Sequence, residues 1–160
     1  MIKSAVFASG CFWGTQHYFG KTEGVIATTV GYIGGNLANP TYEQVSTGTT
    51  DHVEAVKVEY DSTKTNYEKL AKMFFETHDP TQVGGQGPDI GSQYQSKIFY
   101  GDEDEHKIAT SLIQILEDQG LEIATKVEPL STFYPAEEYH QDYYSKNGQS
   151  PYCHIYRKLF

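Results

Sequence analysis

Residues 3–19 read KSAVFASGCFWGTQHYF, and two kinds of hydrophobic spacing meet within this stretch. Lys3–Ala8 is short and apolar, which predicts a buried strand. Gly10 interrupts the strand, and the apolar residues of Cys11–Phe19 then recur at a helical spacing. A strand that enters a helix through a glycine presents Cys11 at the bend, next to an aromatic surface. The stretch therefore predicts the first β-α unit of the fold and a sulfur atom placed for chemistry.

Strand and helix signals alternate along the rest of the chain. Runs of β-branched or apolar residues predict strands, and apolar residues three and four positions apart predict helices. The expected strands are Val25–Ile33, Val53–Tyr60, Lys97–Tyr100 and Ala124–Leu130, and the expected helices are Asn66–His78, Glu103–Gln119 and Glu137–Ser145. The order strand-helix-strand, twice over, predicts an α+β two-layer sandwich with a ferredoxin-like core (β-α-β-β-α-β).

Two segments lack a periodic pattern. Residues 79–94, DPTQVGGQGPDIGSQY, hold two prolines and four glycines among polar residues. A loop of this length inside a compact domain is usually functional. The last fifteen residues predict a coil C-terminal tail. At 160 residues, the chain is expected to form one domain over residues 1–160.

Composition limits the classes of partner. The formal net charge is −9, from 21 acidic and 12 basic residues, so the chain is not expected to bind nucleic acid or an anionic membrane. No apolar run approaches the roughly 18 residues that a membrane span needs, and no secretory signal is visible. The cytoplasm is therefore the expected compartment.

The two cysteines, Cys11 and Cys153, lie near opposite ends of the chain. A reducing cytoplasm disfavours a permanent bridge between them but permits a transient catalytic one. At the start of a helix, free backbone N–H groups favour the thiolate, which would lower the pKa of Cys11 and make its sulfur a nucleophile. A buried structural cysteine in an aromatic core is an equally open interpretation on the residues alone.

The motif Gly10-Cys11-Phe12-Trp13-Gly14 resembles the signature of the A-type peptide methionine sulfoxide reductases. Further pieces keep the order of that family and span nearly the whole chain. They are GYIGG (31–35), NPTYEQV (39–45), HVEAVKVEYD (52–61), HDPTQ (78–82), QGPDIGSQY (86–94) and AEEYHQDY (136–143).

The resemblance implies a single catalytic domain that reduces the S epimer of methionine sulfoxide, free or in oxidised proteins and peptides. It implies thioredoxin as the electron donor, no further cofactor and no metal, and we expect a monomer. By motif, it assigns the nucleophile to Cys11, the methyl-binding wall to Phe12 and Trp13, the acid to Glu54, and the hydroxyls near the sulfoxide oxygen to Tyr42 and Tyr94, with Asp89 close by. The family often carries its recycling cysteine in a C-terminal segment, which here would be Cys153.

These residue types suit the chemistry. A thiolate that attacks a sulfoxide sulfur pushes charge onto the oxygen, which leaves only after protonation. A buried, neutral carboxylic acid such as Glu54 could supply that proton. The hydroxyls of Tyr42 and Tyr94 could stabilise the developing charge. Without the resemblance, Glu54 would be interpreted as a solvated strand residue, the tyrosines as packing residues, and Asp89 as a turn residue.

Other functions have weaker support in the sequence. His52-Val53-Glu54 matches half of a zinc deaminase motif, but the chain lacks the Pro-Cys-x-x-Cys half and any His-x-x-x-His pair, so we expect no metal site. A thiol peroxidase would also form a sulfenic acid, but it has no use for an aromatic methyl-binding wall. A non-catalytic ligand-binding domain would make Cys11 incidental.

Some positions depart from the family pattern. Gln16 replaces a common glutamate, Gly85 and Gln95 replace frequent arginines, and Asp51-His52-Val53 replaces a more usual Gly-His-Ala. None of them belongs to the set of expected catalytic residues. They bear on peptide-backbone contacts and substrate range rather than on the class of reaction.

Overall fold

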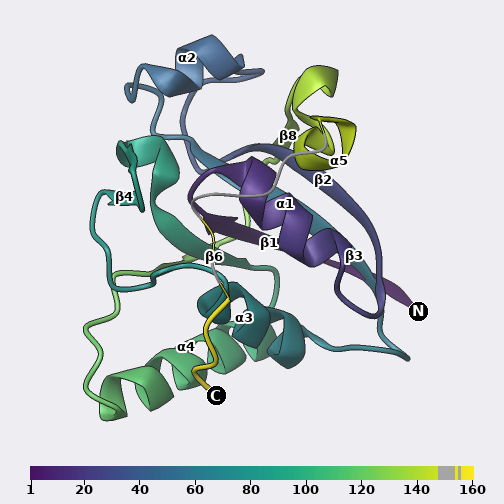
Figure 1. Ribbon diagram of the computed structural model, residues 1–160, viewed down its shortest axis with the longest axis vertical. Coiled ribbons are helices and arrows are strands. Elements are labelled where there is room, and N and C mark those ends of the chain that lie inside the picture. Colours follow the sequence, from purple (N-terminus) through teal and green to yellow (C-terminus); the bar gives the residue numbers. More distant parts are fainter. Residues whose placement is uncertain (148–153, 155) are drawn as a thin grey trace.

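The computed structural model describes residues 1–147, 154 and 156–160. Its centre is a six-stranded sheet with the order β7-β6-β1-β3-β2-β8 (Figure 1). The strands are β1 (Ile2–Ser9), β2 (Val25–Ile33), β3 (Val53–Asp61), β6 (Ser96–Tyr100), β7 (Lys126–Pro129) and β8 (Tyr134–Pro135). The three longer helices are α1 (Phe12–Gly20), α3 (Tyr67–Glu76) and α4 (Glu103–Asp118). The protein thus has a mixed α/β fold with a central sheet and helices.

Four strands form the middle of the sheet. β1 pairs antiparallel with both β3 and β6, and β2 pairs antiparallel with β3. Helix α1 connects β1 to β2, and α3 connects β3 to β6, as the alternating signals predict. β7 joins β6 in parallel, and the short β8 joins the outer edge of β2.

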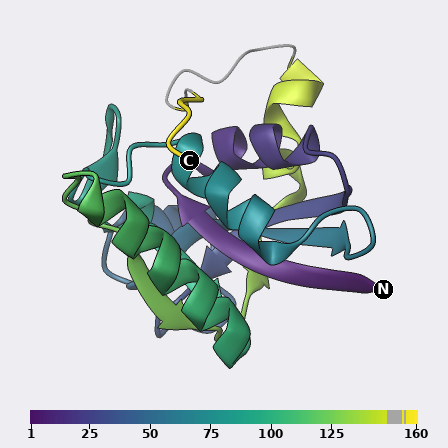
Figure 2. The ribbon, with the colours of Figure 1, turned by 90° about the horizontal axis from the view of Figure 1, so that it is seen from below.

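The two faces of the sheet are covered differently. Along β1, Ala5 and Phe7 face the main core, into which α1, α3 and α4 also pack their apolar sides. Phe7 stacks on Phe19 of α1 and on Phe74 of α3, with ring centroids 5.1 and 5.4 Å apart. Val6 and Ala8 face a second, smaller cluster. Helices α1, α3 and α4 therefore lie on one face of the sheet (Figure 2). The candidate site lies at the end of β1 where α1 begins.

Capping side chains set the helix starts. Asn66 and Asp102 lie just before α3 and α4, and each accepts a hydrogen bond from the backbone N–H three residues later, of Lys69 and Glu105, at 2.9 and 2.8 Å. The first three predicted helices are confirmed, with ends that differ from the prediction by at most two residues. Among the described residues, no helix is long and apolar enough to cross a membrane.

The predicted helix over Glu137–Ser145 is wrong. The segment forms a 3₁₀ turn, Glu138–His140, and a short helix α5 (Tyr143–Asn147). Asp142 separates the two with φ 53°, a left-handed conformation that interrupts a helix. The side chain of Gln141 forms hydrogen bonds with the backbone of Val30 in β2, which holds this segment against the sheet. α5 also takes two residues from the predicted coil tail, while residues 154 and 156–160 lie outside helices and strands.

Two loops contain structure that periodicity does not reveal. Residues 79–94 hold a small hairpin, β4 (Gly85–Gln86) with β5 (Asp89–Ile90), and a 3₁₀ turn η1 (Ser92–Tyr94). The polar segment before β3 holds the short helix α2 (Tyr42–Ser46). A residue pattern cannot detect elements of two to five residues, yet three of them carry expected site residues.

Candidate active site

Two glycines shape the junction between β1 and α1. Gly10 has φ 95°, and a Cβ atom there would lie 2.5 Å from Cβ of Gln86. A Cβ atom on Gly14 would lie 2.3 Å from Nδ1 of His154. The glycines around the cysteine therefore allow a left-handed turn on one side and close packing of a C-terminal side chain on the other. Between them, Cys11 is the N-cap residue of α1 and is 7% exposed.

Glu54 lies on β3, on the same face as Val56 and Val58, and is buried beside α1. Its Oε1 accepts a hydrogen bond from the backbone N–H of Phe12 at 3.2 Å. Its Oε2 is buried and has no hydrogen-bond partner among the described residues. Burial raises the pKa of Glu54 well above its ordinary value, the charges of Cys11 and Asp89 add to this, and the Phe12 hydrogen bond opposes it. The raised pKa favours the neutral acid form of this side chain, and Oε2 is the oxygen that a ligand could contact.

Tyr42 and Tyr94 come from α2 and η1 and reach the same region. Thr41 and Gln44 form a capping box that fixes the start of α2. Burial raises the pKa of Tyr42, the charge of Glu54 adds to this, and hydrogen bonding with Ser46 and Tyr94 opposes it. Burial and the charge of Glu54 also raise the pKa of Tyr94. Both phenols therefore keep their protons and can donate hydrogen bonds.

Asp89 approaches from the β4–β5 hairpin. The amide of Gln86 holds this hairpin, since it accepts from the backbone N–H of Asp79 at 2.7 Å and donates to its carbonyl at 2.8 Å. A Cβ atom on Gly85 would lie 2.5 Å from the Asp89 carbonyl oxygen, so this hairpin excludes a larger residue there. Asp89 contributes to the raised pKa values of both Glu54 and Tyr94, which places the hairpin beside the acid and the phenol.

Phe12 and Trp13 form an aromatic surface at the start of α1. Phe12 is buried, with its ring centroid 5.7 Å from that of Tyr32 and 6.4 Å from that of Tyr42. Trp13 is partly exposed and stacks on Tyr143, with ring centroids 3.7 Å apart and planes 7° apart. The structure thus brings the predicted aromatic pair next to the cysteine, and it adds Tyr143 to them.

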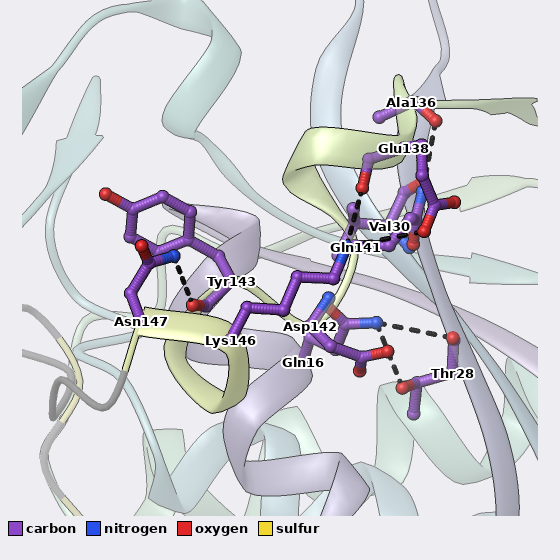
Figure 3. Close-up of polar contacts among 10 residues, drawn as sticks. All are labelled: Gln16, Thr28, Val30, Ala136, Glu138, Gln141, Asp142, Tyr143, Lys146 and Asn147. Atoms are coloured by element: carbon purple, nitrogen blue, oxygen red, sulfur yellow. Dashed lines mark hydrogen bonds and ion pairs between the residues drawn. The ribbon is translucent and has the colours of Figure 1, made fainter.

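Side-chain amides attach the C-terminal segment to α1 and to β2 (Figure 3). Gln16 donates from Nε2 to the Thr28 hydroxyl at 3.1 Å and accepts from the backbone N–H of Asp142 at 2.7 Å. Gln141 accepts from the backbone N–H of Val30 at 3.0 Å and donates to its carbonyl at 3.1 Å, as a neighbouring strand would. The two glutamines flank Asp142 in this view and hold the turn that precedes Tyr143.

A family model for peptide methionine sulfoxide reductase matches residues 3–160. The chain belongs to the peptide methionine sulfoxide reductase family. Peptide methionine sulfoxide reductase MsrA of Nautilia profundicola is 49% identical over 152 residues, which cover 95% of this chain and 88% of that relative.

Solved structures of the family agree with the fold. Mxr1 from Saccharomyces cerevisiae in reduced form matches with a TM-score of 0.90 at 36% identity, over 98% of this chain and 92% of that one. Mxr1 in complex with Trx2 matches with a TM-score of 0.65 at 25% identity, over 98% and 90% of the two chains.

Two residues that were not predicted from the sequence, Glu137 and His140, form hydrogen bonds with residues of the candidate site. Glu137 accepts from the Tyr32 hydroxyl at 2.9 Å and from the backbone N–H of Tyr42 at 3.0 Å. His140 accepts from the indole N–H of Trp13 at 3.0 Å. Both lie in the stretch AEEYHQDY, which the resemblance to the reductases covers, but nothing local in that stretch indicates what these side chains contact.

The remaining predictions concern Cys153, a metal site and His52. Cys153 lies outside the described residues. Within the part of the chain that the structure describes, no three histidine, cysteine or acidic side chains are grouped as a metal site would need. His52, from the half-motif of a zinc deaminase, accepts from the Gly35 backbone N–H at 3.0 Å and bonds through its other nitrogen to the Leu37 carbonyl at 2.7 Å. Both of its ring nitrogens therefore form hydrogen bonds with the backbone of the loop after β2.

Proposed function

We propose that this protein reduces the S epimer of methionine sulfoxide, free or within oxidised proteins and peptides, and takes its electrons from thioredoxin. The observation that carries the proposal is the buried carboxyl of Glu54, whose Oε2 has no partner among the described residues and whose Oε1 is bonded to the residue after Cys11. A neutral acid next to a thiol and an aromatic surface matches the needs of an oxide leaving group. Membership of the reductase family supports the same reaction.

In the first step, the sulfur of Cys11 attacks the sulfur of the bound sulfoxide, while Phe12 and Trp13 hold the methyl group. Glu54 protonates the oxygen as negative charge develops on it, and Tyr42 and Tyr94 donate hydrogen bonds to that oxygen. The attack forms a transient sulfur–sulfur bond. As the protonated oxygen is transferred to the Cys11 sulfur, the S–O bond of the substrate and this sulfur–sulfur bond both break, so the products are methionine and a sulfenic acid on Cys11. The sulfoxide sulfur is reduced and the Cys11 sulfur is oxidised, each by two electrons. Asp89 acts beside these groups by helping to keep Glu54 protonated.

In the second step, the thiol of Cys153 attacks the sulfenic sulfur of Cys11, forms a disulfide and releases water. Thioredoxin then reduces that disulfide through its own dithiol and restores both thiols. The structure of the relative Mxr1 in complex with Trx2 supports thioredoxin as the partner. No other cofactor enters this cycle.

The same proposal covers the wider properties of the chain. The strand order β6-β1-β3-β2, with α1 and α3 as the two crossovers, supports a ferredoxin-like two-layer sandwich as the core. We place residues 1–160 in a single catalytic domain that acts as a monomer in the cytoplasm. The net charge of −9 is consistent with protein substrates rather than nucleic acid.

Comparing substrates tests the function. With thioredoxin and its reductase supplied, the protein should reduce a peptide that contains the S epimer and should leave the R epimer unchanged. A thiol peroxidase would consume hydrogen peroxide faster than either peptide. A non-catalytic binding domain would retain its ligand after alkylation of Cys11. Failure to reduce the S epimer under these conditions would overturn the proposal.

A variant tests the recycling step separately. Cys153→Ser should release about one equivalent of methionine per enzyme and then stall when thioredoxin is the reductant. Dithiothreitol, which is small enough to reach the sulfenic acid directly, should restore turnover. Normal cycling of this variant with thioredoxin would show that Cys153 is not the recycling residue.

A further inference from the structure

The loop that carries Asp89 and Tyr94 is closed at its base by a buried hydrogen bond. Residues 79–95 run between His78, which comes two residues after α3, and Ser96, the first residue of β6. The hydroxyl of Ser96 lies 2.7 Å from Nε2 of His78. This bond joins the residues at which the loop begins and ends, and Ser96 is two residues from Tyr94.

Each hydrogen bond around His78 has a defined direction. A carbonyl can only accept, so Nδ1 of His78 donates to the Phe74 carbonyl 2.6 Å away. Burial lowers the pKa of His78 to about 3, although the Phe74 bond opposes this, so the imidazole is neutral at pH 7. Its Nε2 therefore accepts from the Ser96 hydroxyl. Because that bond uses the hydroxyl proton of Ser96, the Ser96 oxygen accepts from the Thr125 hydroxyl at 2.7 Å.

This network lies beside the strand that leads to Cys11. His78, Ser96 and Thr125 are all buried. Ser96 also pairs with Ser9 in the register of β1 and β6. Buried polar groups that are paired in this way hold their segments in one arrangement, because another arrangement would leave them without partners. The base of the loop is thus fixed relative to the end of β1.

We propose that His78 is a positioning residue for sulfoxide reduction, because its hydrogen bond to Ser96 closes the loop and holds the hydroxyl of Tyr94 where it can donate to the sulfoxide oxygen. This inference rests on the proposed function. His78 takes no proton in the reaction, and its effect passes through Tyr94. Loss of the bond to Ser96 should therefore slow the chemical step more than it weakens substrate binding.

Two variants of His78 separate its two hydrogen bonds. In His78→Asn, the side-chain amide lies near the position of Nδ1, so it can still donate to the Phe74 carbonyl but cannot reach Ser96. In His78→Gln, the amide oxygen lies near the position of Nε2, so it can still accept from Ser96 while the Phe74 bond is lost. Each variant loses one buried hydrogen bond, so the two should be destabilised to a similar extent. A purely structural role would therefore give them similar activities.

A second pair of variants changes the bond from its other end. Ser96→Ala removes the hydroxyl that donates to His78, and it replaces His78→Asn if that variant does not fold. Ser111→Ala is the matched control, since Ser111 is exposed on α4 and its hydroxyl donates to the Ile108 carbonyl within that helix. Thermal unfolding verifies that each variant is folded.

The first measurement is independent of activity. The backbone N–H of Tyr94 donates to the Gly91 carbonyl at 3.1 Å within the loop. Hydrogen exchange at this amide should be roughly 10-fold faster than in the wild type for His78→Asn and Ser96→Ala, because the base of the loop is no longer closed. Exchange in His78→Gln and Ser111→Ala should resemble that of the wild type.

The second measurement tests whether His78 acts through Tyr94. His78→Asn should lower the single-turnover rate with an S-sulfoxide peptide by roughly 10-fold to 10²-fold and change KM little, whereas His78→Gln should stay near the wild-type rate. In a Tyr94→Phe background, His78→Asn should have little further effect. Equal rates for the two His78 variants, an equal loss in both backgrounds, or unchanged exchange would overturn the role of His78. Absence of turnover in the wild type would instead overturn the proposed function.

Discussion

Two walls of different character meet at Cys11. The polar wall consists of Glu54, Tyr42, Tyr94 and Asp89, which come from β3, α2, η1 and β5. The aromatic wall consists of Phe12 and Trp13 of α1, with His140 and Tyr143 from the C-terminal segment. The polar wall keeps protons on groups that burial and mutual repulsion prevent from ionising. The aromatic wall contains stacked rings and the hydrogen bond from the Trp13 indole to His140.

From this difference we expect the two walls to have separate tasks. Neutral acids and phenols near a developing oxide lower the barrier of the chemical step. Under the proposed function, fixed aromatic rings would hold the substrate in the geometry for attack. Changes to the polar wall should therefore reduce the single-turnover rate, and changes to the aromatic wall should raise KM.

The largest effect on turnover is expected from a change at the sulfur of Cys11, which lies between the two walls. Cys11→Ser replaces the nucleophilic sulfur with a hydroxyl of nearly the same shape, so the variant should fold normally and lose essentially all turnover. Methionine release from a sulfoxide peptide measures the loss, and thermal unfolding verifies the fold. Near-wild-type turnover would remove Cys11 from the mechanism.

The next largest effect is expected from the acid of the polar wall. Glu54→Gln can still accept the hydrogen bond from Phe12 and can donate one, but it cannot transfer a proton. The single-turnover rate should fall by roughly 10²–10⁴. The pKa of Glu54 is raised in the folded state, so ionisation of the unfolded chain above the ordinary carboxyl pKa reduces stability as the pH rises. Glu54→Gln should therefore be more stable than the wild type at pH 7, with the difference shrinking at pH 4.

A smaller effect is expected from each phenol. Tyr42→Phe and Tyr94→Phe each remove one donor near the oxide, and each should lower the single-turnover rate by roughly 10²-fold while changing KM little. Tyr139→Phe is the matched control, because Tyr139 is an exposed tyrosine at the rim of the aromatic wall. Equal effects of all three changes would argue against a specific role for Tyr42 and Tyr94.

The smallest effect is expected where the aromatic wall is anchored. Gln16→Met keeps the length of the side chain but removes its bonds to Thr28 and Asp142. The free energy of unfolding should fall by about 1–3 kcal/mol, because the two partly buried hydrogen bonds of the buried Gln16 side chain are lost. KM should rise a few-fold while the single-turnover rate at saturation stays near that of the wild type. A loss in that rate instead would contradict the division between the walls.

Much of the polar wall could be predicted from the sequence, because its residues lie in recognisable motifs. The β1–α1 junction also follows from local signals, namely an apolar run, Gly10 and a helical spacing. The close approach of Gln86 to Gly10 and of His154 to Gly14 could not be predicted, since each joins segments far apart in the chain.

The aromatic wall was predicted only in part for the same reason. Helical spacing in Glu137–Ser145 favoured a continuous helix, but the Gln141 side chain replaces a strand partner of Val30 and holds the segment in an irregular path. His140 gains its importance only from the indole that this path places next to it. Such contacts between distant residues leave no periodic signal in the sequence.

The pH dependence of a single turnover tests the central claim, that Glu54 delivers the proton, most directly. Methionine formed in one turnover would be measured by rapid quenching across the pH range for the wild type and for Glu54→Gln. Because the acid form exists below the raised pKa of Glu54, the wild-type rate should fall as the pH rises through that pKa. Glu54→Gln should be slow and should lack this decline. The same decline in both proteins, at similar rates, would contradict the claim.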